Sequence, residues 1–226
     1  MNLRFATLAV SLLVSVTAAS APRPDPRKPS QFVCPDIAAA SDIPYPVDTI
    51  AAGAVSLLLS LDSSAKIQNV QILRDFPSLT SSVQTAVQNW TFSPATLHGQ
   101  TVASELSVSV IFNLFNPAGG AALQSLVLSP PQTIPPDASQ FTPPQITTAS
   151  FANYPANSVS QGTVVLDVTV GKAGQVKTVR VIRDVPTLTQ QAVAAVKTWQ
   201  FNAATLRGQP IAAQIVIAFV FPRNTV

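Results

Sequence analysis

The chain has 226 residues, of which 10% are charged and 20 are prolines, and its formal net charge is +3. This length suits one large domain or two small ones, and apolar residues in short pieces are typical of a globular protein with several strands. So mild a charge, without a dense basic run, gives no indication of nucleic-acid binding.

A secretory signal peptide is predicted over residues 1–21. Arg4 precedes an apolar run, and small residues at 18–21 follow it, which is the pattern of a cleavable signal. We expect cleavage at about 18–21. The alternative is an uncleaved inner-membrane anchor, although the run is short for a span of about 20 residues. Either way, the rest of the chain is expected outside the cytoplasm.

A proline-rich lead-in follows at 22–34. It ends at Cys34, the only cysteine of the chain, so no internal disulfide can form. A lone thiol near a domain edge is the favoured interpretation, ahead of a reactive site.

The rest of the chain is an internal repeat. Shifted by 109 residues, 35–112 aligns with 144–221 without a gap, and 26 of the 78 pairs are identical. We expect two domains, at 35–115 and 144–226. Between them, 116–143 contains several prolines, which favour a semi-rigid spacer. Within it, 121–128 is apolar enough for a short docked strand or helix.

The strands are clearest in the second copy. Apolar residues alternate from Val164 to Val170 and predict a strand with one buried face. A glycine-containing turn at 171–174 leads into a second strand, where the valines at 176, 179 and 181 break strict alternation. The pattern predicts an antiparallel hairpin with a bulge near Lys177–Thr178.

The period then changes to that of a helix. Apolar residues from Leu188 to Trp199, and from Leu79 to Trp90 in the first copy, fall on one helical face. This register assigns the two tryptophans to the core. A last apolar strand closes each copy, and segments near 46–52 and 155–161 are candidates for a short first helix. The fold class is therefore α+β, with two tandem domains that each hold a three-stranded antiparallel sheet and helices on one face.

The order of these motifs resembles the TonB C-terminal domain family. In each copy, Tyr-Pro precedes a glycine and alternating apolar residues, and a helix ends in Trp-x-Phe before Gly-Gln and the closing strand. The resemblance covers 44–112 and 153–221. It implies a periplasmic module of a Gram-negative energy-transduction system, which binds the plug peptide of an outer-membrane receptor as an added strand.

The resemblance also implies which residues bind. The last strand of each copy is the candidate edge, because an exposed apolar edge is a template for pairing. Its candidate partner-binding residues are Val102, Leu106, Val108, Val110 and Phe112 in the first copy, and Ile211, Ile215, Ile217, Phe219 and Phe221 in the second. Tyr45, Pro46, Tyr154 and Pro155 are expected near these edges.

Arg74 and Arg183 are candidate charged contacts to the peptide. Each precedes an aspartate, so the alternative is a surface arginine beside a helix N-cap, and this alternative is favoured.

The chain departs from a complete transducer of this family. Such a transducer has an uncleaved anchor that carries a histidine, whereas the only histidine here is His98. The resemblance therefore supports a protein-binding role for this chain better than a role in energy transduction. No nucleophile–base pair, metal-ligand cluster or phosphate loop is recognisable, so we expect no enzyme activity, no cofactor and no metal.

The two copies differ in charge. Residues 35–112 hold two basic and six acidic residues, and 144–221 hold six basic and two acidic. Opposite charges of −4 and +4 suggest either that the copies dock on each other or that they meet different partners. The predicted function is a periplasmic protein-binding module that supports TonB-dependent transport. The alternative is an envelope scaffold that reuses the fold without energy transduction.

Overall fold

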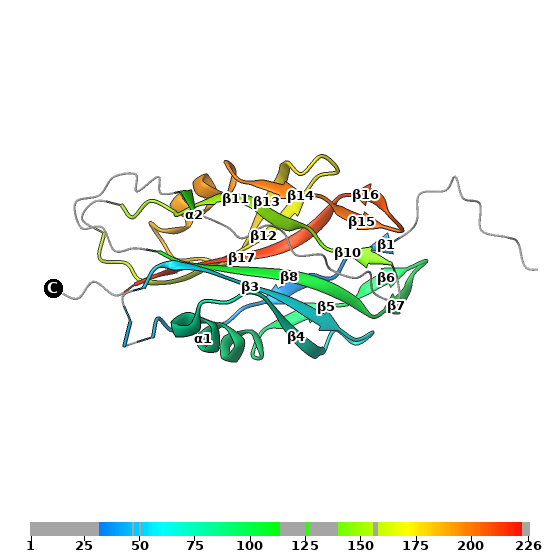
Figure 1. Ribbon diagram of the computed structural model, residues 1–226, viewed down its shortest axis with the longest axis horizontal. Coiled ribbons are helices and arrows are strands. Elements are labelled where there is room, and N and C mark those ends of the chain that lie inside the picture. Colours follow the sequence, from blue (N-terminus) through cyan, green and yellow to red (C-terminus); the bar gives the residue numbers. More distant parts are fainter. Residues whose placement is uncertain are drawn as a thin grey trace, which may run out of the picture. The chain divides into compact units, whose positions relative to one another are not determined.

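Each copy folds as a strand hairpin, a helix, short strands and a long last strand (Figure 1). The computed structural model describes residues 32–222 except 47, 50, 114–124, 127–139 and 156–157. The predicted signal peptide at 1–21, the lead-in up to residue 31 and most of the predicted linker lie outside the described residues.

The elements of the first copy are β1 (Phe32–Val33), β2 (Asp36–Ala39), β3 (Gly53–Leu61), β4 (Ile67–Arg74), α1 (Pro77–Val87), β5 (Thr91–Ser93), β6 (Ala95–Leu97), β7 (Gln100–Val102) and β8 (Ser104–Phe112). Those that follow are β9 (Ser125–Leu126), β10 (Phe141–Thr142), β11 (Gln145–Ser150), β12 (Gly162–Val170), β13 (Val176–Arg183), α2 (Thr189–Val196), β14 (Gln200–Asn202), β15 (Ala204–Leu206), β16 (Gln209–Ile211) and β17 (Ala213–Phe221).

The hairpins β3–β4 and β12–β13 are antiparallel, and the predicted bulge is confirmed. Thr169 faces Thr178 while Val170 faces Val176, so Lys177 is the extra residue. The turn before it needs Gly174, which has φ +80; a Cβ there would lie 2.0 Å from the carbonyl oxygen of Phe201. The turn therefore also fixes the approach of β14.

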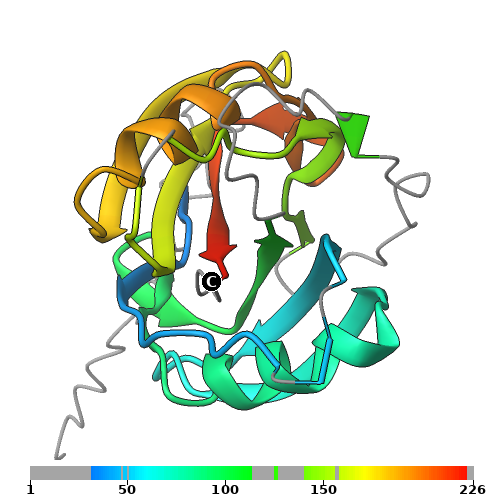
Figure 2. The same ribbon diagram turned by 90° about the vertical axis from the view of Figure 1, so that its left-hand side faces the viewer.

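The long strands of both copies form one six-stranded sheet in the order β13-β12-β17-β8-β3-β4 (Figure 2). Each copy contributes three antiparallel strands, as expected. The two last strands lie side by side at the centre and run parallel, with residues 216–220 opposite 108–112. The prediction that β8 and β17 lie at sheet edges is therefore wrong.

The core explains this arrangement. Alternate residues of β8 and β17 belong to two clusters on opposite faces of the sheet, so each strand buries one face in its own copy and one in the other. Val216, Ala218 and Val220 join the cluster of the first copy, while Ala54 and Ile111 join that of the second. A strand that is buried on both faces removes nearly all of its apolar surface from water. This burial is the main driving force for the association of the two copies in one sheet.

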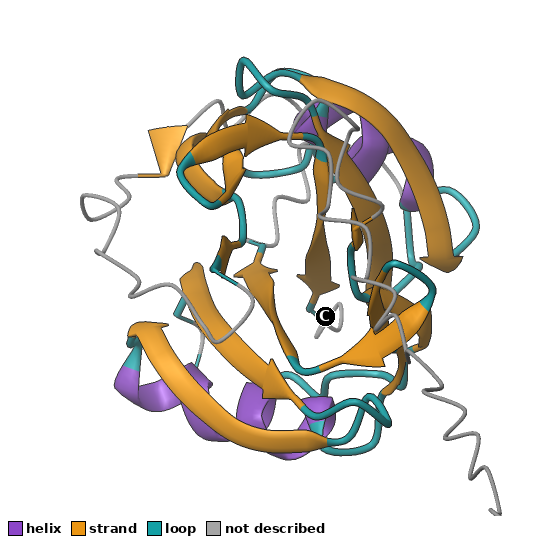
Figure 3. Ribbon diagram, turned by 90° about the vertical axis from the view of Figure 1, so that its right-hand side faces the viewer, coloured by secondary structure: helices purple, strands orange, loops and turns teal. Residues whose placement is uncertain are grey.

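The helices α1 and α2 cover opposite faces of this sheet (Figures 1 and 3). Trp90 and Trp199 follow the helices and are buried, which confirms their assignment to the core. The residues before the helices, Phe76 and Leu188, make no side-chain cap. Neither Asp75 nor Asp184 is the N-cap residue; the Asp75 carboxylate instead accepts a bond from the Thr80 hydroxyl.

Of two further expectations, the first is wrong and the second, a short docked strand, is confirmed. The described residues of 46–52 and 155–161 contain no helix, so the predicted first helix of each copy is not found there. Within the apolar stretch 121–128, Ser125–Leu126 forms β9, which pairs with Ala149 and Ser150 of β11. Across the described ranges, neither helix has the length and hydropathy that a membrane span requires.

Candidate protein-binding edges and the contact between the copies

The strands predicted to bind a partner are closed on both sides over much of their length. β8 pairs with β3 and β17, and β17 pairs with β12 and β8. The residues of this set that lie in β8 and β17 are Leu106, Val108, Val110, Phe112, Ile215, Ile217, Phe219 and Phe221, and all are buried. Val102 and Ile211 lie instead in the short strands β7 and β16. Partner binding by these residues stays a prediction.

The two Tyr-Pro pairs lie next to the last strands. The Tyr45 ring packs edge-on against Phe112 at 5.3 Å between ring centres, and Tyr154 lies 6.0 Å from Phe221. Each tyrosine hydroxyl donates a hydrogen bond to a carbonyl six residues ahead, that of Ala51 or Ser160. Each tyrosine thus ties the segment that follows it to the end of the closing strand, and Pro46 and Pro155 come directly after the rings.

The outer strands of the sheet are β4 and β13. In the described part of the chain, β4 pairs only with β3, and β13 pairs only with β12. Ile72 and Val181 occupy equivalent positions on these strands, and both are unusually exposed for their type, at 39% and 41%. The outer strands are therefore the candidate protein-binding edges of the shared sheet.

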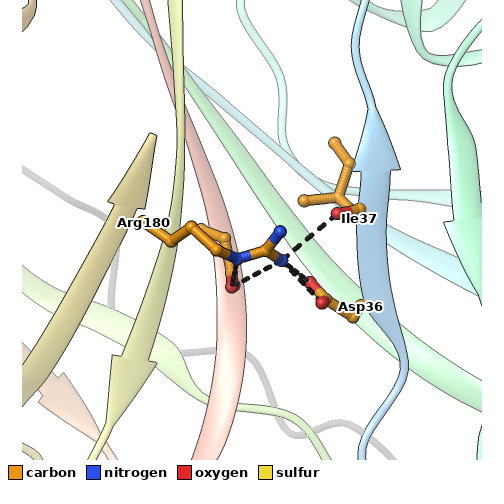
Figure 4. A network of polar contacts seen from close by, with 4 residues as sticks. Asp36, Ile37 and Arg180 are labelled. Carbon is orange, nitrogen blue, oxygen red and sulfur yellow. Dashed lines mark hydrogen bonds and ion pairs between the residues drawn. The ribbon is translucent and has the colours of Figure 1, made fainter. Parts of the chain in front are cut away.

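A charged network holds the first copy to β13. The Arg180 guanidinium contacts both carboxylate oxygens of Asp36 on β2, at 2.5 and 2.6 Å, and donates to the carbonyl of Ile37 (Figure 4). The same group pairs with Asp167 on β12 at 3.0 Å. Arg180 thus bridges one partly exposed and one buried carboxylate, and it fixes β2 against the sheet.

Asp167 is the unusual member of this network. It is only 5% exposed, and its Oδ1 is buried without a described hydrogen-bond partner. Burial, with a smaller effect from the Asp36 charge, raises the pKa of Asp167 to about 6, although Arg180 acts in the opposite direction. A carboxylate here is therefore tolerated because of Arg180.

A second set of contacts continues the union toward the start of β12. Arg183 lies 3.2 Å from Asp42 and donates a 2.6 Å hydrogen bond to the carbonyl of Thr163. The Thr163 amide donates to Asp42, and its hydroxyl bonds to the backbone of Ile43. Arg183, a candidate contact to a partner peptide, thus contacts the first copy.

The two ion pairs just described, Arg180–Asp36 and Arg183–Asp42, each join an acidic residue of the first copy to a basic residue of the second. This is the arrangement expected if opposite charges bring the copies together. The sequence did not single out Arg180 or Asp167. One signal was available, since Asp167 interrupts an otherwise apolar strand, and a charge at such a position needs a partner.

The remaining predicted residues lie elsewhere. Arg74 ends β4 and is half-buried, and burial lowers its pKa. His98 and Arg207 occupy the same turn in the two copies, with φ of 54° and 52°. The turn therefore keeps its shape when the histidine is replaced. Cys34 lies beside the carbonyl of Ala212, and burial raises the pKa of its thiol to about 12.

Comparison with known proteins gives one match. The sequence profile of the family "Gram-negative bacterial TonB protein C-terminal" matches residues 47–114 and 152–222, more than half of the chain. No curated protein and no solved structure matches the chain significantly. The family is one of envelope-associated protein-interaction domains. The chain therefore belongs to the Gram-negative bacterial TonB protein C-terminal family and carries its domain twice.

Proposed function

We propose that this protein is a periplasmic protein-binding module that contacts outer-membrane receptors or other envelope proteins by β-strand addition, in support of TonB-dependent transport. One observation carries the proposal: the shared sheet ends in two strands, β4 and β13, that each pair on one side among the described residues. An extended peptide gains main-chain hydrogen bonds on such an edge, and neighbouring side chains select it.

The family and the predicted signal support the location and the class of partner. The matched family is defined on TonB proteins of Gram-negative bacteria, and a secretory signal leads to the periplasm of such cells. No step of the proposal needs a cofactor or a proton-driven motor.

A second candidate function is an envelope scaffold. It is favoured by the pairing of β8 with β17, because these are the strands on which the resemblance places peptide binding. If β8 and β17 serve to hold the two copies together, they are not free to bind a receptor peptide, and the protein uses the family fold as a scaffold.

Titration of the isotope-labelled full chain with a synthetic receptor plug peptide tests the proposal by NMR. We expect saturable amide shifts concentrated in β4 or β13. Shifts in β8 and β17 would mean that the copies separate on binding and that the last strands are the binding strands after all. The absence of any shift at about millimolar peptide, an affinity near −4 kcal/mol, would leave the scaffold.

A further inference from the structure

The two outer edges of the sheet differ in charge. β13 carries Lys177, Arg180 and Arg183, whereas β4 has no charged residue before Arg74, its last. Charged side chains, lysine above all, are the usual device that keeps an edge strand from pairing with another chain. β13 has this protection over its whole length, and β4 lacks it over residues 67–72.

The two arginines of β13 are also engaged in ion pairs. Arg180 is held by Asp36 and Asp167, and Arg183 is held by Asp42. A peptide that lies along β13 has to accommodate these contacts or displace them. Displacing Arg180 would leave the buried Asp167 carboxylate without its counter-charge, which is strongly unfavourable.

The corresponding positions on β4 are neutral. Gln71 stands where β13 has Arg180, and Gln68 stands where it has Lys177. Gln68, Asn69, Gln71 and Ile72 are all exposed. The Gln68 amide donates a 2.9 Å hydrogen bond to the Asp62 carboxylate, so the strand offers chiefly Asn69, Gln71 and the apolar Ile72 to a partner. Amides bond to neutral backbone and side-chain groups of a bound strand, and Ile72 provides apolar contact to a residue opposite it.

We infer that the β4 edge, over residues 67–72, accepts an extended, uncharged segment of a partner protein, and that the β13 edge does not. This inference rests on the proposed function and names both the strand and the kind of segment. The occupant is uncharged because β4 itself carries no charge over this stretch, and the nearby Asp62 carboxylate already accepts hydrogen bonds from the amides of Ser64 and Lys66 and from the Gln68 side chain. The net charge of −4 on 35–112 disfavours an acidic segment.

A matched pair of variants tests the choice of edge. Ile72→Lys places a charge on β4, and Val181→Lys places the same charge at the equivalent position of β13. Both side chains are exposed to nearly the same extent, so the two variants should fold equally well. Circular dichroism and the melting temperature of each variant check this.

The probe is a fluorescent, acetylated hexapeptide of alternating threonine and valine, followed by anisotropy with the full chain. We expect it to bind and Ile72→Lys to weaken it about tenfold, near 1.4 kcal/mol, with Val181→Lys within about twofold of wild type. The same peptide with every second backbone nitrogen methylated should not bind, because it loses main-chain donors. Replacing its threonines by glutamates should weaken binding.

Three results would overturn the inference. One is a larger loss for Val181→Lys than for Ile72→Lys; another is tighter binding of the glutamate peptide. The third is a concentration-dependent dimer, seen by light scattering, that Ile72→Lys dissolves, because the occupant would then be a second copy of this chain. If the receptor plug peptide binds but shifts only β13 or the last strands, this inference fails and the proposed function stands. If neither peptide binds, both fail.

Discussion

The outer strands β4 and β13 occupy equivalent places in the sheet but differ in their charged residues. On the β13 side, Arg180 joins the buried Asp167 to Asp36 of the other copy. On the β4 side, the corresponding positions are Gln71, Leu58 and Gln145, none of which is charged. The two copies thus meet in one shared sheet, although only the β13 side has charged residues at these three positions. This difference indicates that backbone pairing and the apolar core hold the two copies together. Charged residues distinguish the β13 side of the shared sheet from the β4 side.

The largest expected effect comes from placing a carboxylate in the first copy at position 58, which is equivalent to Asp167. Leu58 is 1% exposed and pairs with Gln71, whereas the equivalent Asp167 pairs with Arg180. Leu58→Asp should lower the free energy of unfolding by about 3 to 5 kcal/mol, because it buries a charge without a counter-charge. Urea denaturation at neutral pH measures this.

Adding Gln71→Arg to Leu58→Asp provides the control. The double variant rebuilds the β12–β13 pair on β3–β4 and should recover part of the loss. If Leu58→Asp alone costs less than about 1 kcal/mol, position 58 is not the closed environment described here.

The next effect comes from removing the cation itself. Arg180→Ala should destabilise the protein by about 2 to 3 kcal/mol, because Asp167 is left buried and Asp36 loses its partner; half of the arginine is exposed, which keeps the loss below that of a fully buried pair. Gln71→Ala, the matched change on β4, should cost less than about 0.5 kcal/mol. Thermal unfolding of the two variants measures the difference, and equal losses would contradict the distinction between the edges.

Much of each copy could be predicted from the sequence, because local patterns carry it. The bulge at Lys177 shows in the spacing of the valines, and Trp90 and Trp199 show in the helical register. The shared sheet could not be predicted in the same way. Both faces of β17 are apolar, as in a strand that is buried on both sides. In β8, however, serines alternate with apolar residues, which is the pattern of a strand with one face in solvent. Ser109 is buried and its hydroxyl bonds with that of Ser56, so its polarity does not mark a solvent face.

The candidate site shows the same limit. Arg183 was recognised because both copies keep it, but its contact with Asp42 depends on a pairing that no local pattern encodes. Arg180 and Asp167 were missed because the first copy has Gln71 and Leu58 at their places. A comparison of the copies favours what they share, and the contact between them relies on what they do not share.

A smaller effect follows from the pKa of Asp167. Its pKa of about 6 in the folded protein lies above the ordinary value of 3.8, so the folded state holds this proton to higher pH than the unfolded state. Stability should therefore fall by about 2 kcal/mol as the pH rises from near 4, through the folded-state pKa, to near 7, and should not change further through this group above that pH. Chemical denaturation across this range measures it, and Asp167→Asn should flatten the slope. A slope that is unchanged in the variant would assign the titration to another group.

The smallest effect concerns the outer ion pair. Asp42 is half-exposed and makes two contacts, an ion pair with Arg183 and an accepted bond from the Thr163 amide. Asp42→Asn keeps an acceptor for the amide and removes only the charge, so it should cost about 0.5 kcal/mol, the usual size for an exposed pair. Asp42→Ala removes both contacts and should cost about 1 kcal/mol more, because the amide loses a bond in a partly buried position.

Added salt separates the two contributions, because it screens the charge and leaves the amide bond. The stability difference between wild type and Asp42→Asn should shrink in about 0.5 M NaCl, while the difference between the two variants should not. If salt changes both differences equally, the charge and the amide bond act as one unit, and the outer pair is a more integral part of the union than its exposure indicates.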